Sequence, residues 1–389
     1  MTLPLHMRRD GFAPAAELAA ARDEEGVRLF ETPIGDRVWL VTRVADVRRV
    51  LGDPARFGNS ARHLVPGAPA LSDEELARVR PGNVLGYDPP EHTRLRRLLA
   101  PGFTARRVRL LEAGVHGIVR DHLDAMADAG PPADLVPAFA LPVPSLVICE
   151  LLGVPYAERA EFQQRAADFF DVSLTPEQRM DVALRSRAYL AGLVDRARVD
   201  PGDDLLGVLV RAGELDGDEL VGVADLLLLA GHETTANMLG LGVHALLRHP
   251  DQLRLLRERP DLVDGAVEEL LRWLTVVHTG VPRVVTADVE LGGRELAEGD
   301  LVVCSLPAAN RDPDLLPDAD ELDLTRRPTG HVAFGHGAHH CLGAPLARLE
   351  MRAAFPALLR RFPALRLAGE PEFRPTQVVY GLSSLPVTW

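Results

Sequence analysis

The amino-acid sequence predicts a mostly α-helical protein with small β-sheets, which places it in the α+β class. Apolar residues recur about every 3.6 positions through most of the 389 residues, as in amphipathic helices. Short β-branched segments interrupt this pattern and are typical of strands. Hydrophobic residues make up 47% of the chain, enough for a sizeable core, and no repeat or linker-like run divides it. We therefore expect residues 1–389 to form a single domain.

The expected elements follow one another along the whole chain. Helical spacing covers Glu17–Phe30, Ala45–Leu51, Pro90–Leu99, Arg106–Ala127, Val143–Leu152, Tyr156–Phe170, Pro176–Arg198, Asp218–Arg248, Pro250–Arg257 and Asp264–Leu274. Strand patterns cover Arg37–Thr42, Gly280–Val285, Val289–Leu291, Asp300–Cys304, Val378–Leu382 and Leu385–Thr388. The segment Ser60–Asn83 is rich in proline and glycine, and we expect it to be a mostly irregular loop that forms part of a pocket lid.

Charge and cysteine content exclude several classes of protein. The formal net charge is −13, so general affinity for nucleic acid or for anionic membranes is not expected. Three cysteines without framework spacing argue for a reducing compartment, and Cys149 and Cys304 lie in apolar surroundings typical of a core. The apolar stretch over residues 220–246 is interrupted by polar residues, and the N-terminal segment lacks the apolar core of a signal peptide. We expect a cytoplasmic protein that does not span a membrane.

The segment from Phe334 to Gly343, Phe-Gly-His-Gly-Ala-His-His-Cys-Leu-Gly, places Cys341 just before a helical pattern that starts near Ala344. Free amide groups at the start of a helix lower the pKa of a thiol, so Cys341 is suited to bind a metal. Glycines such as Gly335 let the backbone turn tightly and approach a flat ligand closely. Haem, zinc and a purely structural loop are the alternatives. Nearby histidines favour zinc, but the usual spacing of zinc ligands is missing.

The helix expected at Asp218–Arg248 carries polar residues within an apolar stretch, in the sequence Ala230-Gly-His-Glu233-Thr234. A buried carboxylate loses solvation, and a threonine inside a helix tends to donate back to the carbonyl four residues earlier, here that of Ala230. Gly231 could let the helix open into a groove in which Glu233 and Thr234 organise water for proton delivery. The alternative is that Glu233 faces solvent and Thr234 only caps a local bend.

Two further segments hold charged residues at helical spacing. Glu269 and Arg272 are three residues apart and can form an ion pair, although such pairs mostly lie on surfaces. His92 and Arg96 share one face of a helix and could bind carboxylates, but a surface helix would carry them equally well.

The segments from about Asp88 to the C-terminus follow one another in the order of the motifs of the cytochrome P-450 family. They resemble this family of haem-thiolate monooxygenases. The resemblance implies the cytochrome P-450 fold, with haem b between the long central helix and the cysteine loop. It implies that Cys341 is the iron ligand and that Glu233 and Thr234 deliver protons for oxygen activation. The residues that it assigns to haem binding are His92, Arg96, Ala230, Arg283, Phe334, Gly335, His339, Cys341 and Gly343.

The resemblance also implies that Glu269 and Arg272 form a buried structural brace for the cysteine loop. Family members often add an arginine from the connection that precedes this loop. This sequence departs from that pattern, because Glu321 and Leu322 stand where Arg-Phe is common. Arg326 is a candidate substitute.

The implied activity is insertion of one atom of O₂ into an apolar small molecule, by hydroxylation or epoxidation of a secondary metabolite, with electrons from a ferredoxin and its reductase. Arg97, Arg348 and Arg352 could form a basic patch for an acidic ferredoxin, or be ordinary solvated arginines. Oxidative coupling, peroxide-driven oxidation and a haem carrier or sensor without turnover are the alternatives. The acid and the hydroxyl favour O₂ activation over peroxide use and over a carrier or sensor, but they do not decide between hydroxylation and oxidative coupling. By analogy the substrate pocket is expected at Val84, Leu85, Phe170, Leu226, Val277, Val379 and Tyr380.

Overall fold

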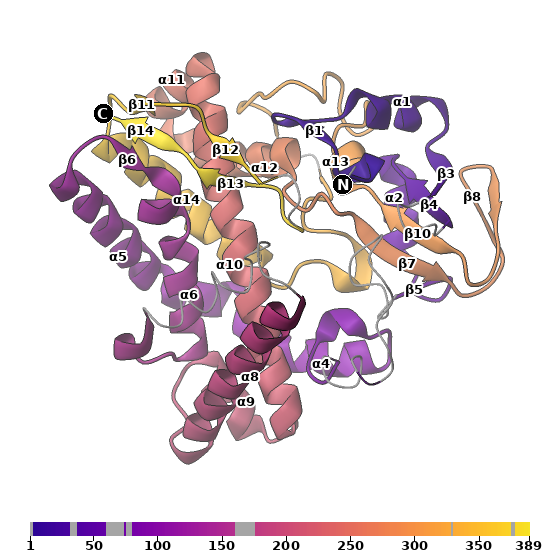
Figure 1. Ribbon diagram of the computed structural model, residues 1–389, viewed down its shortest axis with the longest axis horizontal. Helices are drawn as coiled ribbons and strands as arrows, with labels where there is room; N and C mark the ends of the chain where they lie inside the picture. The colour runs from indigo at the N-terminus through magenta and orange to yellow at the C-terminus, as the bar shows by residue number, and fades with distance from the viewer. Residues whose placement is uncertain are drawn as a thin grey trace.

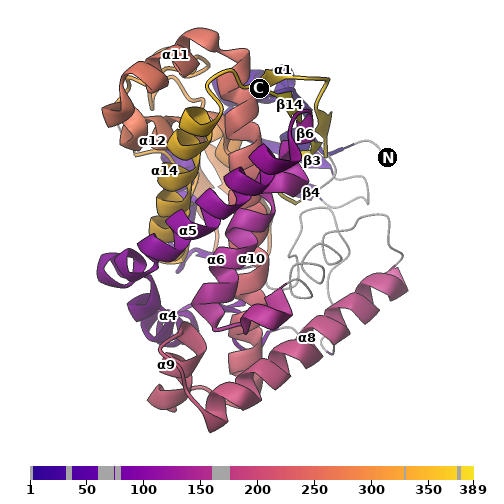
Figure 2. The same cartoon turned by 90° about the vertical axis from the view of Figure 1, so that its left-hand side faces the viewer.

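The computed structural model describes residues 3–31, 37–59, 74, 80–159, 176–327, 330–374 and 378–389. The longest described helix, α10 (Gly217–Arg248), runs through the middle of the molecule (Figure 1). The helices that pack against it include α6 (Pro142–Leu152), α8 (Pro176–Val199) and α14 (Ala344–Arg361). Helix α5 (Ala105–Ala129) packs against α6 and α14 in turn, as Figure 2 shows from the side.

Local sequence signals fix the ends of the helices. At the start of α10 the backbone N–H of Glu219 donates to Asp216 Oδ1 at 2.8 Å, and the N–H of Asp216 donates to Glu219 Oε2 at 3.1 Å. Helix α6 ends at Gly153, whose φ of 71° is the left-handed conformation that glycine adopts freely. The remaining described α-helices are α1 (Ala16–Glu24), α2 (Val44–Gly52), α4 (Glu91–Leu99), α9 (Leu205–Ala212), α11 (Pro250–Glu258), α12 (Val263–Leu274) and α13 (Leu306–Ala309).

The strands form small sheets beside the helical part. The largest described sheet has the order β3-β4-β10-β7-β5, in which β4 and β10 are parallel and the other neighbours are antiparallel. Its strands are β3 (Val27–Glu31), β4 (Arg37–Val41), β5 (Phe57–Gly58), β7 (Val281–Val285) and β10 (Leu301–Cys304). Smaller sheets join β1 (Arg9–Asp10) to β2 (Ala13–Pro14), β8 (Val289–Leu291) to β9 (Arg294–Leu296), and β12 (Glu372–Phe373) to β13 (Leu382–Ser384). Strand β14 (Pro386–Thr388) lies between β11 (Arg366–Leu367) and β6 (Ala133–Asp134).

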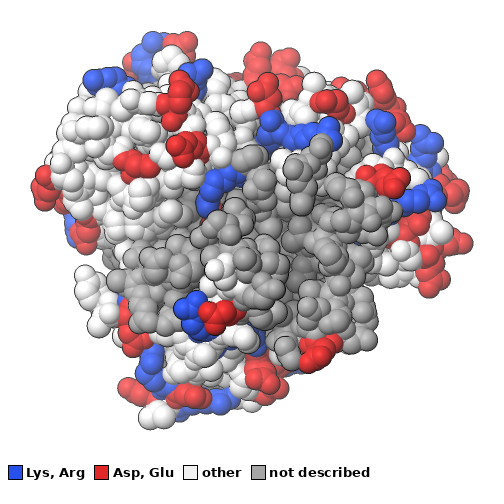
Figure 3. Space-filling model, in the orientation of Figure 1, with Lys and Arg blue, Asp and Glu red and all other residues white. Residues whose placement is uncertain are grey.

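Charged side chains are mixed over the face shown in Figure 3, where acidic and basic groups alternate across the described surface. This pattern agrees with an acidic chain that carries 43 arginine and lysine residues against 56 aspartate and glutamate residues. Among the described helices, none combines the length and the apolar character that a bilayer crossing requires.

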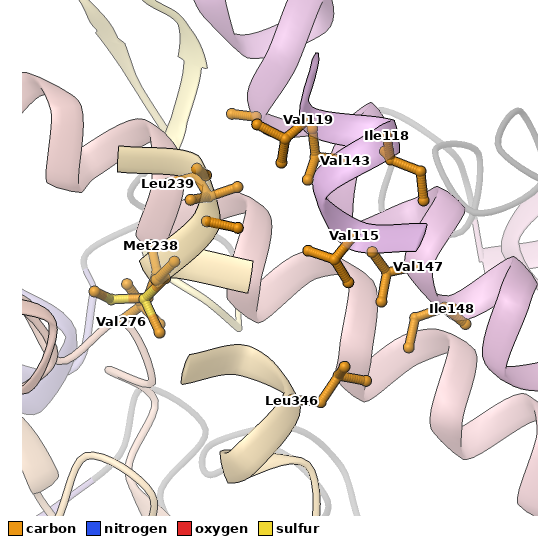
Figure 4. Packing of buried hydrophobic residues seen from close by; sticks show 14 of the residues in the cluster. Val115, Ile118, Val119, Val143, Val147, Ile148, Met238, Leu239, Val276 and Leu346 are labelled. Carbon is orange, nitrogen blue, oxygen red and sulfur yellow. The ribbon is translucent and has the colours of Figure 1, made fainter. Parts of the chain in front are cut away.

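The core is one large apolar cluster around α10. Figure 4 shows Val115 of α5, Val147 of α6, Met238 and Leu239 of α10 and Leu346 of α14 within this cluster. A second cluster fills the space beside the five-stranded sheet, with Val41, Phe57 and Val302 among its buried members. The two clusters hold the helical part and the strand-rich part that flank the site described below.

One predicted helix is wrong. The sequence predicts a single helix over Glu17–Phe30, whereas the chain forms α1 and then strand β3. Gly26 lies between them with a φ of 76°, which ends the helix, and Val27 then pairs with Val41 in the sheet. Apolar spacing in a short segment cannot reveal a strand partner that comes later in the chain.

Other predicted segments are partly tested. Of Tyr156–Phe170, residues 156–158 form a short 3₁₀ turn, and residues from 160 onward lie outside the described residues. Most of Ser60–Asn83 also lies outside them. The strand predicted over Val378–Leu382 is displaced, because β13 begins at Leu382 and only an isolated bridge joins Val379 to Val277. The other predicted helices and strands are confirmed, with ends that differ by a few residues.

Candidate active site

The loop before α14 holds Cys341 through a series of tight backbone bonds. The N–H of Cys341 donates to the carbonyl of Phe334 at 2.9 Å, which closes the loop on itself. Gly335 and Gly337 have φ values of 71° and 70°. A Cβ on Gly337 would lie 2.3 Å from the carbonyl oxygen of Leu51 in α2, so only glycine allows the loop to approach this helix so closely.

Cys341 differs from the other two cysteines in its exposure. Its side chain is exposed, unlike those of Cys149 and Cys304, which are buried. Burial by the surrounding protein raises the pKa of Cys341, and hydrogen bonds from the backbone amides of Gly343 and Ala344 oppose this rise. The two amides at the start of α14 would stabilise the thiolate form that ligates a metal.

Four nitrogen-bearing side chains gather next to this loop, contributed by α4, β7 and the loop itself. The rings of His92 and His339 lie 4.1 Å apart between centroids. Both ring nitrogens of His92 and Nε2 of His339 are buried without a hydrogen-bond partner. Burial, and then repulsion by His92, Arg283 and Arg96, lowers the pKa of His339 to about 3. A site of this kind requires anionic groups that compensate the positive charge of these side chains.

In the described part of the chain the charge of Asp88 supplies only part of that compensation, because it opposes the lowering of the pKa of His92 and of Arg283 without reversing it. No ion pair there joins any of these four residues to a carboxylate, and both oxygens of the nearby Asp88 accept the backbone N–H of Asn59. Arg96 donates to the carbonyl of His340 at 2.7 Å, which ties α4 to the cysteine loop. Unpartnered donors beside an exposed thiol fit a ligand that carries both a metal and carboxylates. A haem with its two propionates has this composition.

Helix α10 has one stripe of exposed residues. Leu226, Ala230 and Thr234, spaced four residues apart, are partly or fully exposed although the rest of the helix centre is mostly buried. Thr234 Oγ1 donates to the carbonyl of Ala230 at 2.7 Å, as the sequence predicts. These three residues are therefore the part of the helix centre that a ligand could contact, and the small side chain of Ala230 leaves space there.

Glu233 does not face solvent. Its side chain is buried, and Oε1 accepts hydrogen bonds from Arg374 Nη2 at 2.8 Å and from Asn237 Nδ2 at 3.0 Å. A charged carboxylate is thus kept inside the protein by a cation and an amide. The alternative that Glu233 is a solvated surface residue is wrong.

Comparison with known proteins decides the family. A family model described as Cytochrome P450 matches residues 196–383. Cytochrome P450 FAS1 from Rhodococcoides fascians is 47% identical over 393 residues, covering 100% of this chain and 98% of that protein. The chain belongs to the cytochrome P450 family.

Further relatives agree over almost the whole length of this P450. Mycinamicin IV hydroxylase/epoxidase from Micromonospora griseorubida is 42% identical, covering 97% of this chain and 96% of that protein. The solved structure of P450 StaH from glycopeptide antibiotic A47934 biosynthesis is 46% identical with a TM-score of 0.90, covering 99% of this chain and 100% of that one. This P450 is therefore a monooxygenase that uses a haem-thiolate cofactor, O₂ and electrons from redox partners. The exposed thiol and the unpartnered donors described above fit that cofactor. Among the described residues no cluster of three or more His, Cys, Asp or Glu side chains suits another metal such as zinc.

The ion pair of Glu269 and Arg272 is buried in this P450. The structure also shows which arginine lies beside this pair, a point that the sequence leaves open. Arg272 Nε and Nη2 donate to the two oxygens of Glu269 at 2.7 and 2.8 Å. Arg326 Nε lies 3.5 Å from Glu269 Oε1 and takes the place of the third arginine. Arg326 also donates to the carbonyls of Pro317 and Asp318, so it fixes the connection that leads to the cysteine loop.

The predicted pocket residues fall into three groups. Leu85 is exposed, and Leu226 and Val277 are partly exposed, as lining residues should be. Val84 and Val379 are buried at the edge of the same region. Tyr380 is buried as well, and its hydroxyl donates to the carbonyl of Gly11 at 2.7 Å, so its assignment to the pocket stays a prediction. Phe170 lies outside the described residues.

The arginines considered for redox docking are each paired with a carboxylate. Arg97 Nη2 lies 3.0 Å from Glu214, and Arg352 Nε lies 2.7 Å from Asp264. Arg348 donates to both oxygens of Glu268 at 2.6 and 2.8 Å. Their charges are compensated, so these three residues by themselves do not form a basic patch.

Two residues of the site escape the sequence analysis. Arg374 is 141 positions away from Glu233, and no local spacing links the two. Asn237 follows Glu233 by one helical turn, so its side chain could have been recognised as a partner from the i, i+4 spacing alone. Arg348 has a further role, because its guanidinium lies 4.6 Å from the ring centre of Phe334 and packs against the cysteine loop.

Proposed function

We propose that this P450 binds haem b, with Cys341 as iron ligand, and oxidises an apolar secondary metabolite by hydroxylation or epoxidation. The observation that carries the proposal is the exposed Cys341 thiol beside a group of donors that lack anionic partners. The relatives named for mycinamicin and for a glycopeptide antibiotic support the class of substrate.

In this proposal each side of the cofactor has its own residues. When bound, haem supplies the redox chemistry of oxygen activation. His92, Arg96, Arg283 and His339 bind the propionates, and Phe334, Gly335 and Gly343 shape the loop around the thiolate. Gly335 and Gly343 act through the backbone path of the loop, and Phe334 shields the sulfur from water.

On the other side, α10 provides the proton path. Ala230 leaves space beside the helix, and with the cofactor bound the Thr234 hydroxyl would accept a proton from water and hold it for oxygen activation. Glu233 resupplies that proton. The partly exposed Leu226 and Val277, together with Leu85, give the substrate an apolar surface that orients it and excludes water.

We further propose that a ferredoxin and its reductase deliver the electrons. Many acidic ferredoxins dock through charge pairs, so rising ionic strength should slow reduction of this P450. An unchanged rate between low and high salt would rule out electrostatic docking.

Binding of carbon monoxide to the reduced, haem-loaded protein tests the ligand. Wild-type protein should show the long-wavelength absorption typical of a thiolate opposite carbon monoxide, and Cys341→His should lose it while keeping haem. Retention of that band in the variant, or absence of haem from the wild type, would refute the proposal.

A second experiment tests the proton path. Replacement of Thr234 by alanine should leave reductant consumption within about threefold of wild type but lower the fraction of electrons that reach product to about a tenth. The readout is product formed per reductant consumed, with a substrate first found by its shift of the main haem absorption band. Equal coupling in the two proteins would contradict the role given to Thr234.

A further inference from the structure

The carboxylate of Glu268, on helix α12, contacts both flanks of the cysteine loop. Arg348 Nε and Nη2, on α14, donate to its two oxygens at 2.6 and 2.8 Å. From the other flank, His331 Nε2 lies 3.3 Å from Glu268 Oε2. One carboxylate therefore joins chain segments that lie ten residues before and seven residues after Cys341. The neighbouring brace of Glu269 and Arg272 is a separate contact.

The cluster of Glu268, His331 and Arg348 is charged and largely enclosed. Its side chains are 15%, 4% and 25% exposed, in that order. Burial raises the pKa of Glu268, but hydrogen bonds from Arg348 and from His331 outweigh this rise and lower the pKa to about 2. The N–H of Ala333 donates to His331 Nδ1 at 3.2 Å, so the hydrogen of a neutral ring is carried by Nε2, which faces Glu268. Glu268 is thus an anion at neutral pH that is bound in the bidentate manner by Arg348.

The aromatic ring of Phe334 lies beside this cluster. The guanidinium of Arg348 is 4.6 Å from the ring centre, and the rings of His331 and Phe334 are 6.3 Å apart between centroids. Because two hydrogen bonds to Glu268 fix the guanidinium, Arg348 cannot swing away from the ring without breaking both. The carbonyl of Phe334 accepts the N–H of Cys341 at 2.9 Å, which links the position of this residue to that of the cysteine.

These contacts connect a carboxylate on α12 to the residue that is proposed to shield the sulfur. We propose that Glu268 is a positioning residue for the Cys341 ligand: through Arg348 and His331 it holds the Phe334 ring in place and keeps water from the sulfur. The inference rests on the proposed roles of Cys341 and Phe334. Exclusion of water matters, because a hydrogen bond from water to a thiolate withdraws charge from the sulfur and weakens its donation to the metal.

The first test follows the reduced, haem-loaded protein with carbon monoxide bound, at one urea concentration below the unfolding transition. The rate measured is that at which the long-wavelength band gives way to the shorter-wavelength band of a protein that has lost its thiolate bond. Glu268→Gln and Arg348→Gln should each raise this rate about tenfold. The double variant should be no faster than either single variant, because the two residues act as one unit. Arg348→Lys should stay within about threefold of wild type, because lysine keeps a cation beside Glu268 and the ring.

Asp264 and Arg352 provide the matched control. Their ion pair joins the same two helices at 2.7 Å, one turn away from Glu268 and Arg348, but its side chains are 72% and 40% exposed. Asp264→Asn removes the same charge from α12 and should change the rate by less than about twofold. Equal rates in the wild-type and Glu268→Gln proteins, or an equal acceleration by Asp264→Asn, would overturn the inference.

A second readout separates positioning from a general loss of stability. Resonance Raman spectra of the oxidised protein report the iron–sulfur stretching frequency, which falls when water donates to the sulfur. Glu268→Gln and Phe334→Ala should each lower this frequency, and the two substitutions together should lower it no further than Phe334→Ala alone, since the ring is then already absent. An unchanged frequency in the Glu268→Gln protein contradicts the inference whatever its stability, and so does a full additional shift in the double variant.

The same spectra distinguish failure of this inference from failure of the proposed function. A wild-type protein without the long-wavelength band refutes Cys341 as the ligand, and both proposals fall together. A wild-type protein with that band, combined with no effect of Glu268→Gln on the conversion rate or on the stretching frequency, refutes only the positioning by Glu268.

Discussion

Replacement of Arg272 by lysine tests whether the buried brace holds the cysteine loop in place. Arg272 is fully buried, and its guanidinium donates to both oxygens of Glu269 at 2.7 and 2.8 Å. It also donates to the carbonyls of Asn310, Ala319 and Glu321 at 2.8, 2.7 and 3.1 Å. Every N–H group of the guanidinium is thus aimed at an acceptor from one of three chain segments.

The expected loss of stability follows from this count of bonds. A lysine ammonium has three donors and cannot bind a carboxylate in the bidentate manner, so at least two buried acceptors lose their partner. Each such loss costs about 1–3 kcal/mol, and removal of one member of a buried pair costs about 3–5 kcal/mol. We expect Arg272→Lys to lower the free energy of unfolding by about 3 kcal/mol.

The matched control is the exposed pair of Asp251 and Arg254 on α11. It has the same three-residue spacing and an N–O distance of 2.8 Å, but its side chains are 81% and 66% exposed. Arg254→Lys should change stability by less than about 0.5 kcal/mol. Urea denaturation of the haem-loaded proteins, followed by circular dichroism and by haem absorption, measures both values. Equal effects of the two substitutions would refute the reasoning, because burial would then contribute nothing.

Two further predictions concern the loop and the pH dependence of stability. Gly337→Ala should cost about 3 kcal/mol and abolish the long-wavelength carbon monoxide band, because its Cβ would meet the Leu51 carbonyl at 2.3 Å, whereas Gly293→Ala, with a φ of 74° but open space around it, should cost about 1 kcal/mol. Equal losses would show that backbone conformation alone matters. Burial, followed by charge repulsion from Arg248 and His249, lowers the pKa of His244 from 6.5 to about 4. The unfolded chain therefore binds the proton first, and stability is lost as pH falls from 6.5 to 4. His244→Gln should remove about 3 kcal/mol of that loss in denaturation experiments at both pH values.

Much of the fold was accessible from the sequence because the main signals are local. The spacing of apolar residues located α10 and α14, and the acid at Asp216 with its partner Glu219 marks the start of α10. The same kind of signal failed at Val27, where a strand is stabilised by pairing with Val41 rather than by its own pattern. Strand pairing joins residues that are distant in the chain, and no local window contains both.

The residues of the candidate site also divide into those that local sequence patterns identify and those that only the structure reveals. Local patterns singled out Cys341 and Glu233 with Thr234, whereas Glu269 with Arg272 gained its expected role only from the family resemblance. Whether Glu233 is buried or solvated, and which group compensates its charge, depended on a hairpin more than a hundred positions away.

The sequence by itself therefore determined the helices, the family resemblance and the identity of the proposed metal ligand, since all three are written in short contiguous patterns. Only the tertiary structure decided that Arg326 joins the brace, that Arg374 holds Glu233, and that the Tyr380 hydroxyl donates to the carbonyl of Gly11. The physical reason is that desolvation and charge pairing depend on which surfaces meet in space, and packing of distant segments fixes this.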